Sequence, residues 1–560
     1  MCGARAHWGV LLLVATLVAA GCGDDDGRRA TPTLTTTPTL TSTPRSTSTA
    51  TAVPQATATA TPASPPTPPG FERLEHVILV IQENHSFDNY FGVLPYAAGS
   101  PYHAPPTPGA GCAAADSLCI DGLTCTGTTP ATCANANMTA DGTVVQAFHE
   151  SMYCLDAPAH EWLCMHQDQN LCDPNSTTVR ADGFVVVNGV NSPMGYYNED
   201  DLPYYYGLAS TFALSDRHFA SMVGPTLPNR MYGMAATSFG HLLTDAVDSQ
   251  PPGPPGYQPI TGTIFDLLDA AGHTWREYYQ CGDNAVPPRP YAQMFRYADL
   301  PNWVPVAQFE TDTQGATCGL PAVSYVSLYN HEHGPYDIRA GEYDVSMLVD
   351  RLRTGPCWAS SILFITYDEG GGFYDHVAPP LVVSPDGIPP GACADLSNPP
   401  LSKTPGAGAN CSSSADTQAE LASMVVPGEP AADFTQYGFR IPLLAVSPFA
   451  KPRYVSHVVS DHTSLLKLIE DRFTPGRHLT ARDAQSPNLS ELFDFAAAPS
   501  LNATISPRFA PTPGPSDGGC QFPLPSPAPS CVVPMPVPTG PTPTRQPTPP
   551  PATPVCPFSP

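Results

Sequence analysis

Two apolar runs in the sequence each end in a pair of side chains that can bind a metal ion. The run His-Val-Ile-Leu-Val-Ile-Gln is followed by Glu83 and Asn84, and the run Ser-Ile-Leu-Phe-Ile-Thr-Tyr is followed by Asp368 and Glu369. Such runs predict buried strands, and open α/β sheets bind ligands beyond the carboxyl ends of their strands. Oxygen ligands of this kind suit one divalent ion such as Ca²⁺, Mg²⁺, Mn²⁺ or Zn²⁺. The two pairs therefore predict a metal site in an α/β enzyme.

The second pair also has a plainer interpretation, as a solvated charge pair at the end of a strand. Three glycines, residues 370–372, follow Glu369 directly. Glycine lets backbone approach a ligand closely and adopt dihedral angles that other residues avoid. The glycines therefore favour a binding site at this position.

A third motif, Gly224-Pro-Thr-Leu-Pro-Asn-Arg, offers a candidate nucleophile. Thr226 is of a type favoured at the N-cap of a helix, and Pro228 suits the first turn of a helix that continues from Met231. A hydroxyl at this point faces free backbone N–H groups and the positive end of the helix dipole, where a phosphate or an alkoxide is stabilised. A plain capping threonine is the alternative, and Ser221 is a weaker candidate nucleophile.

Four histidines lie next to predicted strand ends or loops, namely His160, His333, His376 and His462. Histidine binds metal, donates to a phosphoryl oxygen or protonates a leaving group near neutral pH. His462 follows Asp461 at the predicted start of an amphipathic helix, which Ser460 or Asp461 would cap. Each histidine taken alone is better explained as structural, and it is their number beside motifs that favours a site.

The 70 prolines divide the chain into regions. Residues 1–22 resemble a secretory signal that ends in a lipobox-like Ala19-Ala-Gly-Cys22, which predicts a lipid anchor on Cys22; simple secretion is the alternative. Residues 23–70 predict a disordered Thr/Pro-rich tether, and residues 509–560 a Pro-rich tail of the same kind. One catalytic region, residues 71–508, is left between them.

Cysteine content and net charge limit the environment and the partners. The 17 cysteines, with a signal segment, predict disulfides in an oxidising compartment. Zinc ribbons are the competing interpretation, but the clusters at 112–133 and 154–172 do not repeat a CxxC spacing. The formal net charge of −26 argues against binding to nucleic acid. A phosphate-bearing substrate would therefore depend on a local site.

Four motifs together resemble a known family. They are Glu83-Asn-His-Ser-Phe-Asp, Gly224-Pro-Thr-Leu-Pro-Asn-Arg, Tyr367-Asp-Glu with Gly371-Gly-Phe-Tyr-Asp-His-Val, and Asp461-His-Thr-Ser. In this order they resemble the bacterial phosphoesterase family of phosphatidylcholine-type phospholipases C and acid phosphatases, within the alkaline-phosphatase-like superfamily. The resemblance covers nearly all of residues 71–480. Two positions depart from the family pattern: His85 stands where arginine is expected, and Gly370 replaces a polar residue.

The resemblance implies both a fold and a mechanism. The fold is a central, mostly parallel mixed sheet sandwiched by helices. The metal would be held by Glu83, Asn84, Asp368 and Glu369, and Thr226 would attack phosphorus to form a phospho-enzyme that water resolves. The resemblance also assigns phosphate contact or proton transfer to His160 and His333. We further predict that His376, Asp461 and His462 belong to the catalytic site.

These expectations lead to one main hypothesis and two alternatives. A threonine in the Gly-Pro-Thr motif resembles the phospholipase branch of the family, so the expected substrate is a glycerophospholipid. The anchor on Cys22 would hold the protein at a membrane. The first alternative is an acid phosphatase that acts on phosphomonoesters. The second is a surface lipoprotein that kept the fold as a binding module without catalysis.

Overall fold

The computed structural model describes residues 68–244, 259–280, 291–295, 301–392 and 432–513. The predicted signal segment with Cys22, nearly all of the tether and nearly all of the tail lie outside these residues. The boundaries of the catalytic region therefore stay a prediction. None of the helices in the described residues is long and apolar enough to cross a membrane.

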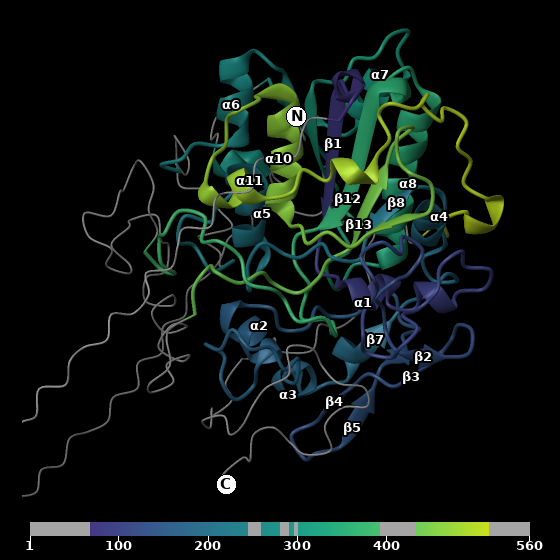
Figure 1. Cartoon of the computed structure of the whole chain (residues 1–560), viewed down its shortest axis with the longest axis vertical. Coiled ribbons are helices and arrows are strands. Elements are labelled where there is room, and N and C mark those ends of the chain that lie inside the picture. The colour runs from purple at the N-terminus through teal and green to yellow at the C-terminus, as the bar shows by residue number, and fades with distance from the viewer. Residues whose placement is uncertain (1–67, 245–258, 281–290, 296–300, 393–431, 514–560) are drawn as a thin grey trace, which may run out of the picture. The chain divides into compact units, whose positions relative to one another are not determined.

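An eight-stranded sheet forms the centre of the fold (Figure 1). Seven strands run in the same direction, and β13 alone is antiparallel to both of its neighbours. In spatial order the strands are β10 (Trp303–Pro305), β9 (Trp275–Tyr279), β11 (Val323–Ser327), β1 (His76–Gln82), β12 (Ser361–Tyr367), β13 (Leu443–Val446), β8 (Ala213–Ser215) and β14 (Tyr454–Ser456). The predicted α/β class with a mostly parallel mixed sheet is confirmed.

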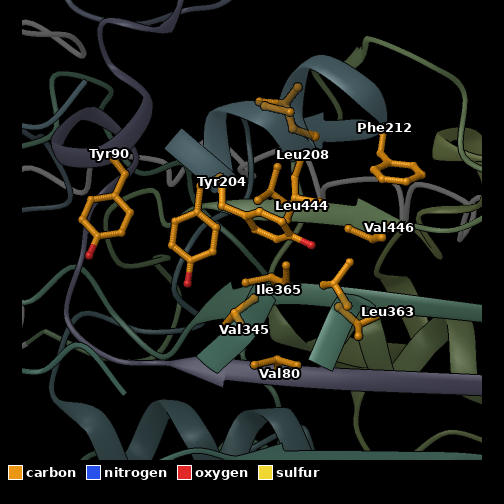
Figure 2. Packing of buried hydrophobic residues seen from close by; sticks show 14 of the residues in the cluster. Val80, Tyr90, Tyr204, Leu208, Phe212, Val345, Leu363, Ile365, Leu444 and Val446 are labelled. Atoms are coloured by element: carbon orange, nitrogen blue, oxygen red, sulfur yellow. The ribbon is translucent and has the colours of Figure 1, made fainter. Parts of the chain in front are cut away.

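The central strands are apolar on both faces because helices cover both faces. Val77 and Leu79 of β1 pack with α5 (Thr226–Ala235), α6 (Ile264–Ala271) and α10 (His462–Phe473). Ile78 and Val80, the alternate residues, pack with α1 (Phe87–Phe91), α4 (Pro203–Thr211), α7 (Ala307–Gln314) and α8 (Ile338–Thr354). Figure 2 shows part of this second cluster, with Val80 opposite the side chains of α4. The strands whose ends carry the polar pairs are therefore packed between two hydrophobic cores.

Smaller elements occupy the connections between the sheet strands. Three two-stranded ribbons pair β2 (Cys125–Thr126) with β3 (Thr132–Cys133), β4 (Ala136–Met138) with β5 (Val144–Gln146), and β6 (Phe148–His149) with β7 (Gly195–Tyr196). Three short helices are α2 (Trp162–Gln169), α3 (Phe184–Asn188) and α11 (Ala481–Gln485). The 3-10 turns are η1 (Phe71–Arg73), η2 (Leu94–Tyr96), η3 (Ser192–Met194), η4 (Tyr291–Met294), η5 (Trp358–Ser360), η6 (Ser490–Leu492) and η7 (Pro507–Phe509).

All nine cysteines among the described residues are disulfide-bonded. Three pairs are Cys112–Cys119, Cys125–Cys133 and Cys318–Cys357. The preference for disulfides over zinc ribbons is confirmed for this part of the chain, because a sulfur in a disulfide is not available as a thiolate ligand. The oxidised state is typical of proteins outside the reducing cytosol.

Candidate active site

The two polar pairs meet because β1 and β12 are parallel neighbours in register. Gln82 lies opposite Tyr367, so the next residues, Glu83 and Asp368, emerge side by side at the same edge of the sheet. The backbone N–H of Asn84 donates to Asp368 Oδ1 at 3.2 Å. Pairing within the sheet therefore fixes the distance between residues that are far apart in the sequence.

Arg230 lies between the two strand ends. Its Nη2 is 3.0 Å from Glu83 Oε1 and its Nε is 3.1 Å from Asp368 Oδ2. Its Nη groups also donate to the carbonyl oxygens of Ile81 and Gln82 at 3.3 Å. The side chain is only 2% exposed, so these contacts form away from water. The arginine of the Gly-Pro-Thr motif thus joins both polar pairs.

Tyr291 completes the surroundings of Glu83. Its hydroxyl donates to Glu83 Oε1 at 2.5 Å, and its ring stacks on the Arg230 guanidinium with 3.9 Å between the Cζ atom and the ring centroid. His331 Nδ1 is 3.3 Å from the other oxygen of Glu83. Burial alone would raise the pKa of Glu83, but the nearby His331 and Arg230 outweigh it and lower the pKa to about 2.

The pKa values of the second pair, Asp368 and Glu369, are raised, whereas that of Glu83 is lowered. Burial raises the pKa of Asp368 to about 7, although Arg230 opposes the shift. Burial, together with the neighbouring charge of Asp368, raises the pKa of Glu369 well above its usual value. One guanidinium therefore pairs with only two of these three buried carboxyl groups, and the full ionisation of all three needs a further cation.

The side-chain oxygens around these carboxyl groups fit a divalent cation. Asn84 Oδ1 and Glu369 Oε1 are buried and have no hydrogen-bond partner among the described residues. Asn84 Nδ2 lies 3.4 Å from His160 Nε2, so the amide nitrogen is engaged and the oxygen is left over. Unpartnered buried oxygens beside two carboxylates have the hard-ligand chemistry of a Ca²⁺, Mg²⁺ or Mn²⁺ site. A bound ion would be held by these oxygens, together with Glu83 and Asp368.

Close backbone packing explains the glycines after Glu369. A Cβ atom on Gly371 would lie 2.3 Å from the carbonyl oxygen of Asn84, and one on Gly372 would lie 2.6 Å from that of Ala159. Both glycines have positive φ angles, 64° and 68°, as does Asn84 at 67°. The glycines let the Glu369 loop lie directly against the Asn84 turn and the segment that carries His160.

Thr226 is the first residue of α5, with Pro225 at the N-cap position. The prediction that Thr226 is itself the N-cap was therefore wrong by one residue. The side-chain oxygen of Thr244 accepts from the N–H of Leu227 at 2.9 Å, and the Asn229 side chain donates to the carbonyl oxygens of Gly224 and Pro225. Thr226 and Arg230 are four residues apart and share a face of α5, so Thr226 lies about one helical turn before the guanidinium. The candidate nucleophile is therefore one turn along α5 from the arginine that contacts both strand ends.

Two of the predicted histidines lie together beside this centre. The ring centroids of His160 and His333 are 5.5 Å apart. Burial lowers the pKa of His160 to about 4, so the ring is neutral at neutral pH. Its Nδ1 is 2.7 Å from the carbonyl oxygen of Pro158, which requires Nδ1–H and leaves Nε2 as the acceptor for Asn84.

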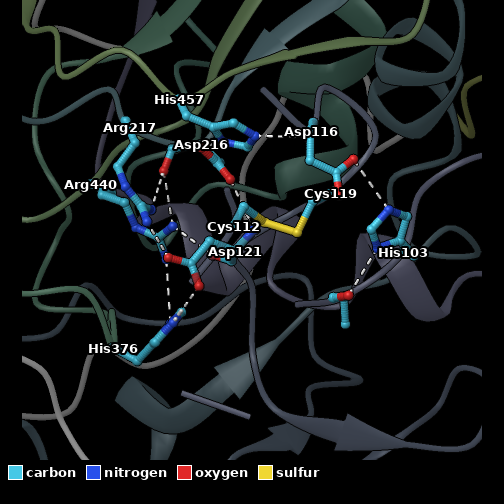
Figure 3. Close-up of a disulfide and its surroundings, with 11 residues drawn as sticks. His103, Cys112, Asp116, Cys119, Asp121, Asp216, Arg217, His376, Arg440 and His457 are labelled. Carbon is cyan, nitrogen blue, oxygen red and sulfur yellow. Dashed lines mark hydrogen bonds and ion pairs between the residues drawn. A yellow bond between two sulfur atoms is a disulfide. The ribbon is translucent and has the colours of Figure 1, made fainter. Parts of the chain in front are cut away.

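His376 lies in a different buried cluster (Figure 3). Its Nδ1 is 2.6 Å from Asp88 Oδ2 and its Nε2 is 3.4 Å from Asp121 Oδ1. Arg440 pairs with Asp88 and Asp375 there, each at 2.9 Å. The structure thus engages His376 in ion pairs that connect α1 with the loop after β12, and does not place it among the strand-end carboxylates.

Asp461 and His462 are buried at the start of α10. Asp461 is the N-cap, as the sequence predicts, and forms a capping box with Ser464. His462 Nε2 donates to the carbonyl oxygen of Tyr367 at 2.8 Å, and its Nδ1 is 2.9 Å from Ser221 Oγ. Ser221 is fully buried and also donates to Asp461. This group ties the loop before Thr226 to the end of β12.

Three other groups of potential ligands occur among the described residues, each with its ligand atoms within 4.8 Å of one another. They are His103, Asp116 and Cys119; Cys112, Asp216 and His457; and Asp88, Asp375 and His376. Cys112 and Cys119 are joined in a disulfide (Figure 3), and Arg440 pairs with both aspartates of the third group. These groups are therefore held together without a metal.

Three side chains that contact Glu83 are not among the residues predicted from the sequence. Arg230 belongs to the Gly-Pro-Thr motif, His331 lies two residues before the predicted His333, and no pattern in the sequence marks Tyr291. His85 does not face the centre: its ring stacks between Tyr90 and Phe373, with centroid distances of 4.3 and 5.0 Å. The departure from arginine at His85 is therefore accommodated by packing.

The fold and the site together define an α/β enzyme with an acid-rich centre at the carboxyl ends of parallel strands. The chain belongs to the Phosphoesterase family, whose model matches residues 74–474. It is a hydrolase that acts on phosphoric ester bonds.

Several curated relatives each match more than half of this chain. Phospholipase C B of Mycobacterium tuberculosis (strain ATCC 25618 / H37Rv) is 29% identical over 473 residues, which are 78% of this chain and 80% of that protein. Hemolytic phospholipase C of Pseudomonas aeruginosa is 28% identical over 492 residues, 76% of this chain and 56% of that protein. Non-specific phospholipase C5 of Arabidopsis thaliana is 29% identical over 350 residues, 56% of each chain.

Solved structures resemble the chain only distantly. Murine ectonucleotide pyrophosphatase/phosphodiesterase 5 covers 52% of this chain and 95% of its own, with 12% identity and a TM-score of 0.31. A protein of the alkaline phosphatase superfamily from Vibrio parahaemolyticus covers 54% of this chain and 66% of its own, with 10% identity and a TM-score of 0.28. Both TM-scores are low, and the fold class follows instead from the order and direction of the strands in the central sheet.

Proposed function

We propose that this protein is a metal-dependent phospholipase C that works through a phospho-threonine intermediate at Thr226. One observation carries the proposal: Thr226 opens α5, and Arg230, one turn later on the same face, pairs with both Glu83 and Asp368. This arrangement supports a site in which a nucleophile at a helix amino terminus acts beside a set of hard oxygen ligands. The phospholipase C relatives support the choice of a phosphodiester substrate.

The reaction has two displacements at phosphorus. In the first, Thr226 Oγ forms a bond to phosphorus and loses its proton, while the bond from phosphorus to the glycerol oxygen breaks and diacylglycerol leaves with a proton. In the second, a water oxygen attacks phosphorus and the bond to Thr226 Oγ breaks, which releases the phosphorylated headgroup and restores the hydroxyl. His160 and His333 are the side chains that we propose contact phosphoryl oxygens or transfer these protons.

Positive charge for the anionic phosphate must come from the site, because the chain carries a formal net charge of −26. At the start of α5 the N–H of Leu227 already donates to Thr244 Oγ1 at 2.9 Å and Pro228 has no N–H, so the helix contributes the positive end of its dipole there. The guanidinium of Arg230 is already bonded to two carboxylates and is not available to the phosphate. A divalent ion held by Glu83, Asn84, Asp368 and Glu369 would act as a Lewis acid on a phosphoryl oxygen.

Parallel assays separate a phospholipase C from an acid phosphatase. The substrates are phosphatidylcholine vesicles, p-nitrophenyl phosphorylcholine and p-nitrophenyl phosphate, each tested with and without a divalent metal. We expect metal-dependent release of diacylglycerol from the vesicles and turnover of the p-nitrophenyl diester. Turnover of the monoester alone would favour the acid phosphatase and refute the phospholipase.

The intermediate is tested at Thr226 itself. Thr226→Ala removes the attacking oxygen and is expected to abolish hydrolysis, whereas Thr226→Ser keeps the oxygen and retains turnover. Acid quenching during turnover, followed by peptide mass spectrometry, should find the phosphorylated headgroup on the peptide that contains Thr226. Full activity of Thr226→Ala would rule out this covalent mechanism.

We also propose that the protein is exported and attached to a membrane through a lipid on Cys22. The nine disulfide-bonded cysteines of the described residues support an oxidising compartment. Metabolic labelling with a fatty-acid analogue tests the anchor: the label should appear in the wild type and disappear in Cys22→Ala. An unlabelled wild type would refute the anchor and leave simple secretion.

A further inference from the structure

A buried carboxylate behind the site is held by four hydrogen-bond donors. Glu332 is 1% exposed. Its Oε1 accepts from Gln82 Nε2 at 3.0 Å and from the Tyr205 hydroxyl at 2.5 Å. Its Oε2 accepts from the hydroxyls of Tyr90 at 2.7 Å and Tyr367 at 2.6 Å. None of these donors is a cation, so the carboxylate is satisfied by neutral groups that come from four different segments.

The residue held in this way lies between two histidines of the site. Glu332 separates His331, whose Nδ1 is 3.3 Å from Glu83 Oε2, from His333, whose ring lies 5.5 Å from that of His160. The backbone is fixed as well, because Glu83 N–H donates to the carbonyl oxygen of His331 at 2.7 Å. Glu332 has a φ angle of 74°, a left-handed conformation that glutamate rarely adopts. A strong side-chain anchor is needed to hold such a turn.

A glycine in α8 supplies an independent observation. Gly341 stands inside this 17-residue helix, where glycine is unfavourable relative to alanine. A Cβ atom at Gly341 would lie 2.2 Å from Glu332 Cγ and 2.8 Å from the carbonyl oxygen of Asn330. The missing side chain therefore makes room for the Glu332 turn against the helix.

From these contacts we infer that Glu332 is a positioning residue for catalysis. Its carboxylate accepts hydrogen bonds from three tyrosines and Gln82. These bonds fix the turn that holds His331 next to Glu83 and His333 next to His160. The inference rests on the proposed function, in which these histidines act on the phosphoryl group. Glu332 itself does not touch the substrate.

Glu332→Gln tests the role, because it keeps the shape and replaces one accepting oxygen with a donor. The matched control is Glu342→Gln, since Glu342 is also fully buried and accepts from the backbone N–H of Tyr205 at 2.9 Å. Both variants are measured for unfolding in urea and for kcat and KM on p-nitrophenyl phosphorylcholine. We expect Glu332→Gln to lower kcat about 100-fold, as a displacement of about 1 Å does, with KM changed less than about threefold.

A double variant distinguishes positioning from plain stabilisation. In a His333→Ala background, Glu332→Gln should cost far less in kcat than in the wild type, because one of the groups it positions is already gone. Should Glu332→Gln fail to fold, Tyr205→Phe removes a single donor and is expected to lower kcat about tenfold by the same route.

The outcomes separate this inference from the proposed function. Equal kcat for Glu332→Gln and Glu342→Gln, with an active wild type, would overturn the positioning role alone. Fully additive losses in the double variant would do the same, as would a Tyr205→Phe enzyme with wild-type kcat. A wild type that hydrolyses no diester refutes the proposed function, and unfolding in urea still reports whether each variant is folded.

Discussion

Replacing Arg230 by lysine tests how the strand-end carboxylates are held. The planar guanidinium meets Asp368 through Nε and Glu83 through Nη2, at 3.1 and 3.0 Å, while its Nη groups reach the carbonyl oxygens of Ile81 and Gln82. A lysine ammonium is a point charge and lacks this fork. Arg230→Lys therefore leaves one of the two carboxylates without its cation.

The magnitude follows from the bond that is lost. A hydrogen bond to a charged group contributes about 1.5–3 kcal/mol to stability, and the pair is buried, with Arg230 2% exposed and Asp368 fully buried. We expect the free energy of unfolding to fall by about 2 kcal/mol. The released carboxylate is a proposed metal ligand, and a shift of about 1 Å in such a group lowers kcat/KM about 100-fold.

Arg440→Lys is the matched control for this variant. Arg440 is also buried, bridges two aspartates at 2.9 Å and donates to the carbonyl oxygens of Asp121 and Asp216, but it does so in the cluster around His376. Urea unfolding should show a similar loss of stability in both variants. Diester hydrolysis should show the large loss of kcat/KM in Arg230→Lys only. Equal kinetic losses, or wild-type kinetics in Arg230→Lys, would refute the reasoning.

Two further predictions concern the same strand ends. With the metal removed by a chelator, the free energy of unfolding should fall as the pH rises from 3.8, the ordinary pKa of aspartate, to about 7, the raised pKa of Asp368, because folding favours the protonated acid. Urea unfolding at pH about 5 and about 8 measures this change. The same dependence of stability on pH in Asp368→Asn would contradict the prediction. Gly371→Ala should abolish hydrolysis and lower stability, because its Cβ would lie 2.3 Å from the carbonyl oxygen of Asn84. Gly387→Ala, with a φ of 71° but no neighbour within 4 Å, should cost only about 1–2 kcal/mol and keep activity.

Local pattern was sufficient for the elements that carry the motifs. The apolar runs before Glu83 and Asp368 form β1 and β12 over the predicted residues, because strands buried on both faces need continuous apolar sequence. The helices after the Gly-Pro-Thr motif and after Asp461 also form as predicted. Their start signals are local, so one segment of sequence is enough to recognise them.

Tertiary structure decided which side chains meet. Arg230 comes from α5, Tyr291 from η4 and His331 from the loop after β11, and they converge on Glu83 only because β11 and β12 flank β1 in the sheet. Strand order is set by contacts between segments that are hundreds of residues apart, which no local pattern encodes. The same holds for His376, whose partners Asp88 and Asp121 lie far from it in sequence.

The sequence by itself determined the two strands, the oxygen-bearing pairs at their ends and the candidate nucleophile. Those features depend on residue type and on spacing within about ten positions, the scale on which hydrophobic periodicity and capping act. The tertiary structure decided that Arg230 neutralises two of the four proposed ligands and that Asn84 and Glu369 keep unpartnered oxygens. Burial, and with it the pKa of each carboxyl group, exists only once the sheet and its two layers of helices have packed.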